Sequence, residues 1–264
     1  MTSSGQQRDT KSDQIDPARA SALQVALGLE GNITQGSALP PFFHQLYFWT
    51  PEPPEKLGRD GHPKVGGFIP DLGLPRRMWA AGRLVFHRPL LAGIQAERET
   101  VIENVTRKSG KSGPLGFVTL RHDFRQRHGL ALTEWQELVY RELDAQSGQP
   151  PRARTDETDR KVHRFDSTLL FRYSALTFNG HRIHYDADYA RTVEGYSGLV
   201  VHGPLLAQLL MLFATEMLGR PIEEFRYRAT APLICGEEGT FCWRDRELWV
   251  RGPDGRQCMA ATCS

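Results

Sequence analysis

The chain has 264 residues, 39% of them hydrophobic and 24% charged, with a formal net charge of +2. This length can bury the core of one large domain or of two domains of roughly 130 residues each, and the small basic surplus does not argue for a nucleic-acid partner. The longest apolar run, 205–214, is far shorter than the roughly 20 residues of a membrane span, so we expect a soluble, cytoplasmic protein.

Residues 1–16 are almost entirely polar, which predicts a disordered tail. Pro17 suits the first turn of a short helix that we expect to end near Leu29. A loop rich in proline and glycine follows over 40–75, and its aromatic residues indicate that it packs on a surface. Strand-like stretches bounded by turn residues come next, at 78–87, 96–106, 116–124 and 132–143. The last of these fits a helix almost equally well, and its neighbours favour a strand.

The second half begins after a polar, proline-containing stretch over 147–161, which is typical of a linker. Ser167 can cap a short helix over 168–175. The helix expected over 204–218 is apolar on every face, so it must be buried on every face. The remaining segments read as strands, and a sheet curled around this helix would bury it; their ranges are 225–232, 239–244, 248–251 and 258–263.

Four cysteines lie in the last thirty residues, at spacings that match no zinc pattern. We therefore expect reduced thiols and no metal site.

The candidate site is the segment 174–186 followed by His202-Gly203. It places an amide (Asn179) and two imidazoles (His181 and His184) just ahead of the apolar helix, whose first N–H groups can donate to an anionic oxygen. Imidazole titrates near neutrality and suits proton transfer to and from water. A buried histidine bonded to a backbone carbonyl is the alternative for His184, and its fixed spacing from Asn179 favours the functional interpretation.

These residues resemble the hydratase motif of the MaoC-like hot-dog superfamily, Asp-x-Asn-Pro-hydrophobic-His followed by His-Gly. Asn179 stands at the Asp position, His181 and Arg182 at Asn and Pro, and His184 at the catalytic His. Gly203 matches the glycine whose N–H serves as oxyanion donor. The variant is most similar to mitochondrial type 2 hydroxyacyl-thioester dehydratases and to mesaconyl- and itaconyl-CoA hydratases.

The resemblance implies an α+β double hot-dog fold, with two antiparallel sheets that each wrap a central helix. It divides the chain into the tail, a degenerate N-terminal unit over 17–146, the linker over 147–161 and a catalytic C-terminal unit over 162–264. The stretch 77–82 fits the first unit of this group, and no second copy of the motif precedes residue 160. We expect the two sheets to pair edge to edge.

The implied activity is reversible hydration of an α,β-unsaturated acyl thioester, carried by coenzyme A and less readily by acyl carrier protein. His184, Asn179 and Gly203 are the predicted catalytic residues, and Arg182, His181 and His202 the predicted substrate-binding ones. No cofactor or metal is implied, and a homodimer is the candidate assembly. Since Asn179 cannot exchange a proton, the identity of the second acid–base group stays open.

Two further expectations concern the substrate and the rival functions. We expect a dicarboxylic acyl-CoA substrate, itaconyl-CoA or mesaconyl-CoA, whose second carboxylate Arg182 could bind. The alternative is that Arg182 binds a carrier phosphate or a neighbouring aspartate. The rivals are a 3-hydroxyacyl-thioester dehydratase of fatty acid synthesis, a hot-dog thioesterase and a non-catalytic acyl-thioester-binding protein. The thioesterase is disfavoured because Glu216, near the far end of the apolar helix, is its only carboxylate.

Overall fold

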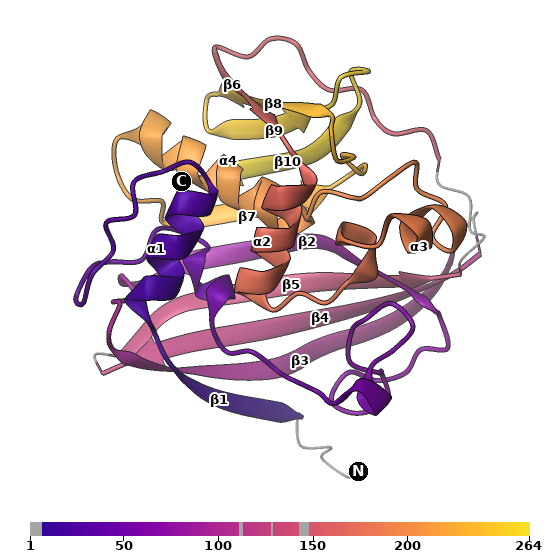
Figure 1. Cartoon of the computed structure of the whole chain (residues 1–264), viewed down its shortest axis with the longest axis horizontal. Coiled ribbons are helices and arrows are strands. Elements are labelled where there is room, and N and C mark those ends of the chain that lie inside the picture. Colours follow the sequence, from indigo (N-terminus) through magenta and orange to yellow (C-terminus); the bar gives the residue numbers. More distant parts are fainter. Residues whose placement is uncertain (1–6, 111–112, 128, 143–147) are drawn as a thin grey trace.

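One continuous antiparallel sheet organises the computed structural model, which describes residues 7–110, 113–127, 129–142 and 148–264 (Figure 1). Within these ranges ten strands follow the order β1-β3-β4-β5-β2-β7-β10-β9-β8-β6. Each half of the chain supplies five neighbouring strands, and the two sets join where β2 pairs with β7, with Gly82 opposite Tyr227. The predicted edge-to-edge pairing is confirmed, and it removes two open edges that could otherwise pair with other chains.

The strands of the N-terminal half are β1 (Arg8–Gln14), β2 (Arg76–Phe86), β3 (Gln95–Gly110), β4 (Gly113–Gln126) and β5 (Gly129–Arg141). Those of the C-terminal half are β6 (Asp159–Arg164), β7 (Glu224–Ala229), β8 (Glu238–Arg244), β9 (Glu247–Arg251) and β10 (Gln257–Cys263). Each stretch predicted as a strand overlaps a strand of the structure. The stretch 132–143, whose pattern did not separate strand from helix, belongs to β5 as far as Arg141, and residue 143 lies outside the described residues.

The central helix α4 (Gly203–Leu218) packs against β7, β9 and β10. Its predicted all-round burial is confirmed, because nine of its side chains are buried, from Leu205 to Ala214. Gly219 ends the helix in the left-handed conformation (φ 63°), which glycine adopts without strain.

The other helices are α1 (Pro17–Ala26), α2 (Ser167–Thr177) and α3 (Ala187–Thr192), with short 3₁₀ turns η1 (Phe43–Leu46), η2 (Pro54–Lys56) and η3 (Arg182–His184). Asp166, rather than the expected Ser167, caps α2 by accepting a hydrogen bond from Leu169 N at 2.7 Å. In the N-terminal half, α1 contacts α2 and η1, and its Ala20 and Leu23 are buried in the hydrophobic core. No helix in the described ranges is long and apolar enough to cross a membrane.

Two boundary predictions need correction. Residues 8–14 of the expected disordered tail form β1, which pairs with β3 through its backbone and is followed by the fully buried Ile15. A polar sequence can form such an edge strand because ladder hydrogen bonds need no apolar side chains. The expected linker over 147–161 ends earlier, because β6 begins at Asp159 and pairs with β8. Residues 1–6 of the tail and residue 147 of the linker lie outside the described residues.

Candidate active site

The motif loop begins where α2 stops. Phe178 takes the left-handed conformation (φ 52°) and ends the helix, and Asn179 N–H donates to Ser174 O at 2.8 Å. The Asn179 side-chain oxygen then accepts a hydrogen bond from His181 N at 3.0 Å, which closes an Asx turn. This turn leads into η3 and directs His184 toward the interior.

His184 is buried and held in one orientation. Its Nδ1 lies 2.7 Å from Val200 O, and since a carbonyl oxygen only accepts, the neutral ring carries its proton on Nδ1. The other nitrogen, Nε2, is left as an acceptor. Burial, together with the neighbouring His181, lowers the pKa of His184 to about 3. The ring is therefore neutral at physiological pH, with Nε2 able to accept a hydrogen bond from water.

His202 and Gly203 complete the C-terminal side of the site. The His202 ring stacks on His184, with centroids 3.7 Å apart, and its Nε2 lies 2.8 Å from the Ser174 hydroxyl. Gly203 starts α4, where N–H groups have no partner within the helix. A Cβ on Gly203 would lie 2.8 Å from the Trp79 ring of β2, so glycine is needed for this close approach.

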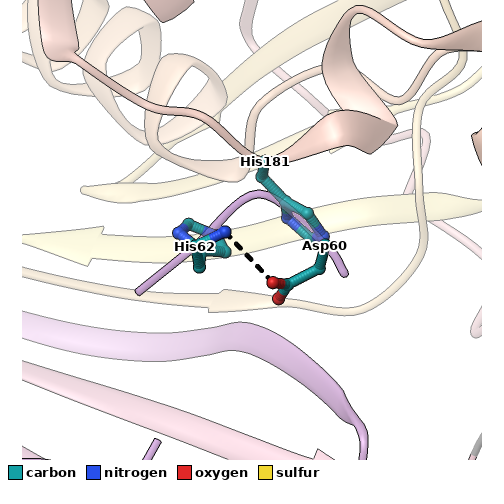
Figure 2. Close-up of side chains that lie close together, drawn as sticks. All are labelled: Asp60, His62 and His181. Carbon is teal, nitrogen blue, oxygen red and sulfur yellow. Dashed lines mark hydrogen bonds between the residues drawn. The ribbon is translucent and has the colours of Figure 1, made fainter. Parts of the chain in front are cut away.

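A turn from the N-terminal half docks on the motif loop. Asp60 O accepts a hydrogen bond from Arg182 N at 2.9 Å, and a Cβ on Gly61 would lie 2.0 Å from Gly180 O. The contact brings a fourth imidazole to the site, beside His181, His184 and His202, because the His62 and His181 ring centroids lie 4.7 Å apart. Figure 2 shows Asp60, His62 and His181 gathered together, with the Asp60 carboxylate accepting from His62 N at 3.0 Å. One ligand atom from each lies within 4.8 Å of the others, so the geometry alone could hold a metal ion.

The imidazoles of the site share one electrostatic character. Burial and the charge of Arg77 together lower the pKa of His62 well below its usual value and that of His181 to about 4. Burial likewise lowers the pKa of His202 well below its usual value, with His184 adding to the effect. The site thus presents neutral rings that donate or accept single hydrogen bonds.

Arg182 is engaged by its own loop. Its Nη2 donates to Asp186 Oδ2 at 2.7 Å, its Nη1 donates to Arg59 O at 3.2 Å, and its guanidinium stacks on Tyr189. This arrangement matches the alternative in which Arg182 binds a neighbouring aspartate, and it stabilises the loop that carries His184.

The structure brings His181, His184, His202 and Gly203 together, as the motif predicts. Asn179 shapes the turn through its oxygen and leaves its amide nitrogen for another partner. Sequence reasoning missed His62 and Arg77, which come from the N-terminal half. The one available signal for His62 was its place after Gly61 in a proline-rich loop.

Comparison with known proteins agrees with this geometry. The family model "Hydroxyacyl-thioester dehydratase type 2" matches residues 42–235. The chain is 45% identical over 263 residues to "Mesaconyl-C(4)-CoA hydratase" of Chloroflexus aurantiacus, covering 96% of this chain and 94% of that protein. It is 27% identical to the mitochondrial "Hydroxyacyl-thioester dehydratase type 2" of Schizosaccharomyces pombe, covering 81% of each.

The fold is shared with a Mycobacterium tuberculosis protein described as having a double hotdog fold. The TM-score is 0.62 at 14% identity, and the match covers 98% of this chain and 95% of that one. The predicted fold class is confirmed. With the motif, the site geometry and these relatives together, the chain belongs to the type 2 hydroxyacyl-thioester dehydratase family of MaoC-like hot-dog proteins and is a hydro-lyase of the hydroxyacyl-thioester dehydratase type.

Proposed function

We propose that the protein reversibly adds water across the α,β double bond of a short dicarboxylic enoyl-CoA, with mesaconyl-CoA or itaconyl-CoA as substrate. The observation that carries the proposal is the 45% identity to mesaconyl-C4-CoA hydratase over nearly the whole chain, on a site that presents the free Nε2 of His184 beside the start of α4.

The site residues suit each step of the reaction. Gly203 N–H donates to the thioester carbonyl oxygen and stabilises the enolate as negative charge develops on it. The Asn179 amide holds the water, and His184 Nε2 takes its proton while the hydroxyl adds to the β carbon. Collapse of the enolate then forms the α C–H bond with the proton that His184 returns. One water is consumed, and His184 ends neutral, as it began.

The aromatic side chains beside Gly203 favour a short acyl group. Trp79 packs on Gly203 and stacks on Tyr227 with ring centroids 4.3 Å apart, and Phe42 meets both rings edge-on. Gly82 makes room for this cluster, because a Cβ there would lie 2.0 Å from the Tyr227 hydroxyl oxygen. Packed aromatic rings at this place support a compact substrate over a long hydrocarbon chain.

The proposal is tested with purified protein and crotonyl-, mesaconyl- and itaconyl-CoA, following loss of the enoyl-thioester absorbance. We expect the dicarboxylic thioesters to have the higher kcat/KM. His184→Ala should lower kcat on the order of 10²–10⁴-fold, the usual contribution of one general base, with an unchanged circular dichroism spectrum. A folded His184→Ala variant that keeps wild-type turnover would contradict the role of His184.

The same assay separates the alternatives. A 3-hydroxyacyl-thioester dehydratase would prefer crotonyl-CoA and longer enoyl chains, and the family match is the observation that favours this second candidate. A non-catalytic acyl-thioester-binding protein would bind all three thioesters and convert none.

We also propose coenzyme A rather than acyl carrier protein as carrier, a cytoplasmic location and a homodimeric assembly. The named hydratase relative acts on a CoA thioester, which supports the first point. Light scattering of the purified protein measures the assembly.

A further inference from the structure

We propose that Arg77 binds the free carboxylate of the substrate and sets the preference for a dicarboxylic acyl group. The inference rests on the proposed function and assigns to Arg77 the role that the sequence suggested for Arg182.

Arg77 lies on the strand that faces the oxyanion position. It is two residues from Trp79 on β2, and residues i and i+2 of a strand share one face, about 6.5 Å apart. The register shift between β2 and β5 falls after Trp79, so it does not disturb this relation. Since Trp79 packs on Gly203, Arg77 projects toward the start of α4 and the motif loop.

The other arginines around the site are already paired. Arg76 Nε lies 3.1 Å from Glu194 Oε2, and Arg59 shares the same carboxylate at 3.7 Å. Arg182 is paired with Asp186. Within the described ranges no carboxylate forms an ion pair with Arg77. Its guanidinium lies against Tyr140, its neutral partner across the sheet, and acts to lower the pKa of that phenol against the larger effect of burial, so the positive charge of Arg77 can still pair with an anion.

The charge of Arg77 also decides what the nearby cluster can hold. That charge lowers the pKa of both His62 and His181, so it opposes any added positive charge at the same place, including a metal ion. The Asp60 carboxylate belongs to this cluster too, but its Oδ1 already accepts from His62 N in the turn. A guanidinium near two neutral imidazoles is a suitable receptor for a carboxylate.

The chemistry of the substrate requires such a receptor close to the water. In mesaconyl-C4-CoA the free carboxylate is attached to the β carbon, the atom that receives the hydroxyl. A group that binds this carboxylate must therefore lie beside His184. The ring contacts place the two histidines influenced by the charge of Arg77 beside His184, because the centroid of His181 lies 5.4 Å from that of His184 and 4.7 Å from that of His62.

The test measures kcat/KM for mesaconyl-C4-CoA and crotonyl-CoA in the wild type, Arg77→Met, Arg77→Lys and the matched control Arg182→Met. We expect Arg77→Met to reduce the mesaconyl-to-crotonyl ratio by at least about 30-fold, since the variant removes one partner of a desolvated charge pair. The mesaconyl-to-crotonyl ratio of Arg77→Lys should lie between those of the wild type and Arg77→Met, because lysine keeps the charge but loses the two parallel hydrogen bonds. Arg182→Met should keep the wild-type ratio within about two-fold.

A binding measurement covers the case of an inactive variant. Succinyl-CoA and butyryl-CoA are saturated, so they bind without reacting, and one of them carries the terminal carboxylate. The wild type should bind succinyl-CoA more tightly than butyryl-CoA, and Arg77→Met should lose this difference.

The possible results distinguish a failure of the proposed function from a failure of the role assigned to Arg77. A wild-type enzyme with no preference for the dicarboxylic thioester would overturn the proposed function and this inference together. A wild-type preference that survives in Arg77→Met would overturn the inference alone, and its loss in Arg182→Met would assign the carboxylate to Arg182. Stoichiometric Zn²⁺ that is retained by the wild type and lost in His62→Ala would show that the cluster takes a cation, against the inference.

Discussion

Five histidines with lowered pKa values should make the protein lose stability between pH 7 and pH 5.5, before its carboxylates titrate. Burial lowers the pKa of each ring from 6.5, to about 4 for His122 and His181 and about 3 for His184, and well below 6.5 for His62 and His202. Below pH 6.5 these histidines bind protons in the unfolded chain but stay neutral in the folded protein. The free energy of unfolding is therefore largest above pH 6.5 and falls as the pH drops toward the folded-state pKa values.

The magnitude follows from proton linkage. Lowering the pH from 7.5 to 5.5 costs about 1.4 kcal/mol for each histidine that stays neutral in the folded state. Five such rings would cost about 7 kcal/mol, a large part of the 5–15 kcal/mol that holds a typical domain folded. Burial raises the pKa of Glu134, but neighbouring His44 and His122 outweigh it and lower that pKa overall. Glu134 therefore also makes the protein less stable as the pH falls, but only below pH 4.5.

His122 allows the effect of one ring on stability to be measured without changing a proposed catalytic residue. It is buried between β3 and β5, and its Nδ1 lies 2.8 Å from the Thr100 hydroxyl. The test measures the free energy of unfolding at pH 7.5 and at pH 5.5 by urea denaturation, followed by tryptophan fluorescence. The loss between the two pH values should be about 1.4 kcal/mol smaller in His122→Gln than in the wild type. Thr100→Val removes the hydrogen bond and keeps the ring, so it should keep the full pH dependence. An equal loss in His122→Gln and the wild type would refute the reasoning.

The elements that the sequence predicted are those whose signal is local. The apolar helix over 204–218 needs a surrounding sheet whatever its partners are, and it is found as α4. The strand β1 was missed because a docked edge strand and a disordered tail can have the same polar composition; its partner β3 lies more than eighty residues away. The start of β6 was assigned to the linker for the same reason, since its exposed alternate residues resemble a solvated segment.

The residues of the site also differ in whether the local sequence predicts them. The motif residues lie close together in the sequence, so the family pattern could place Asn179, His184 and Gly203. The pairing of Arg182 with Asp186 was also accessible, because residues four apart within a helical turn are neighbours. His62 reaches the site through the docking of a distant turn, and no pattern within either segment encodes that contact.

Two substitutions test how the motif loop is built. Asn179→Asp should keep turnover, because its carboxylate can still accept from His181 N, whereas Asn179→Ala should lower kcat because both the turn and the water contact are lost; an unchanged kcat in Asn179→Ala would place this amide outside the reaction. Gly61→Ala should abolish most activity and lower stability by more than Gly66→Ala. Both glycines have positive φ, which costs an alanine roughly 1–2 kcal/mol, but the new Cβ meets Gly180 O at 2.0 Å only at position 61, while its nearest neighbour at position 66 is 3.9 Å away. The clash must push the turn that carries His62 away from the catalytic loop, so kcat/KM and the urea midpoint should fall together in Gly61→Ala, whereas Gly66→Ala should show the strain alone. Equal kcat/KM in the two variants would mean that this turn is not part of the working site.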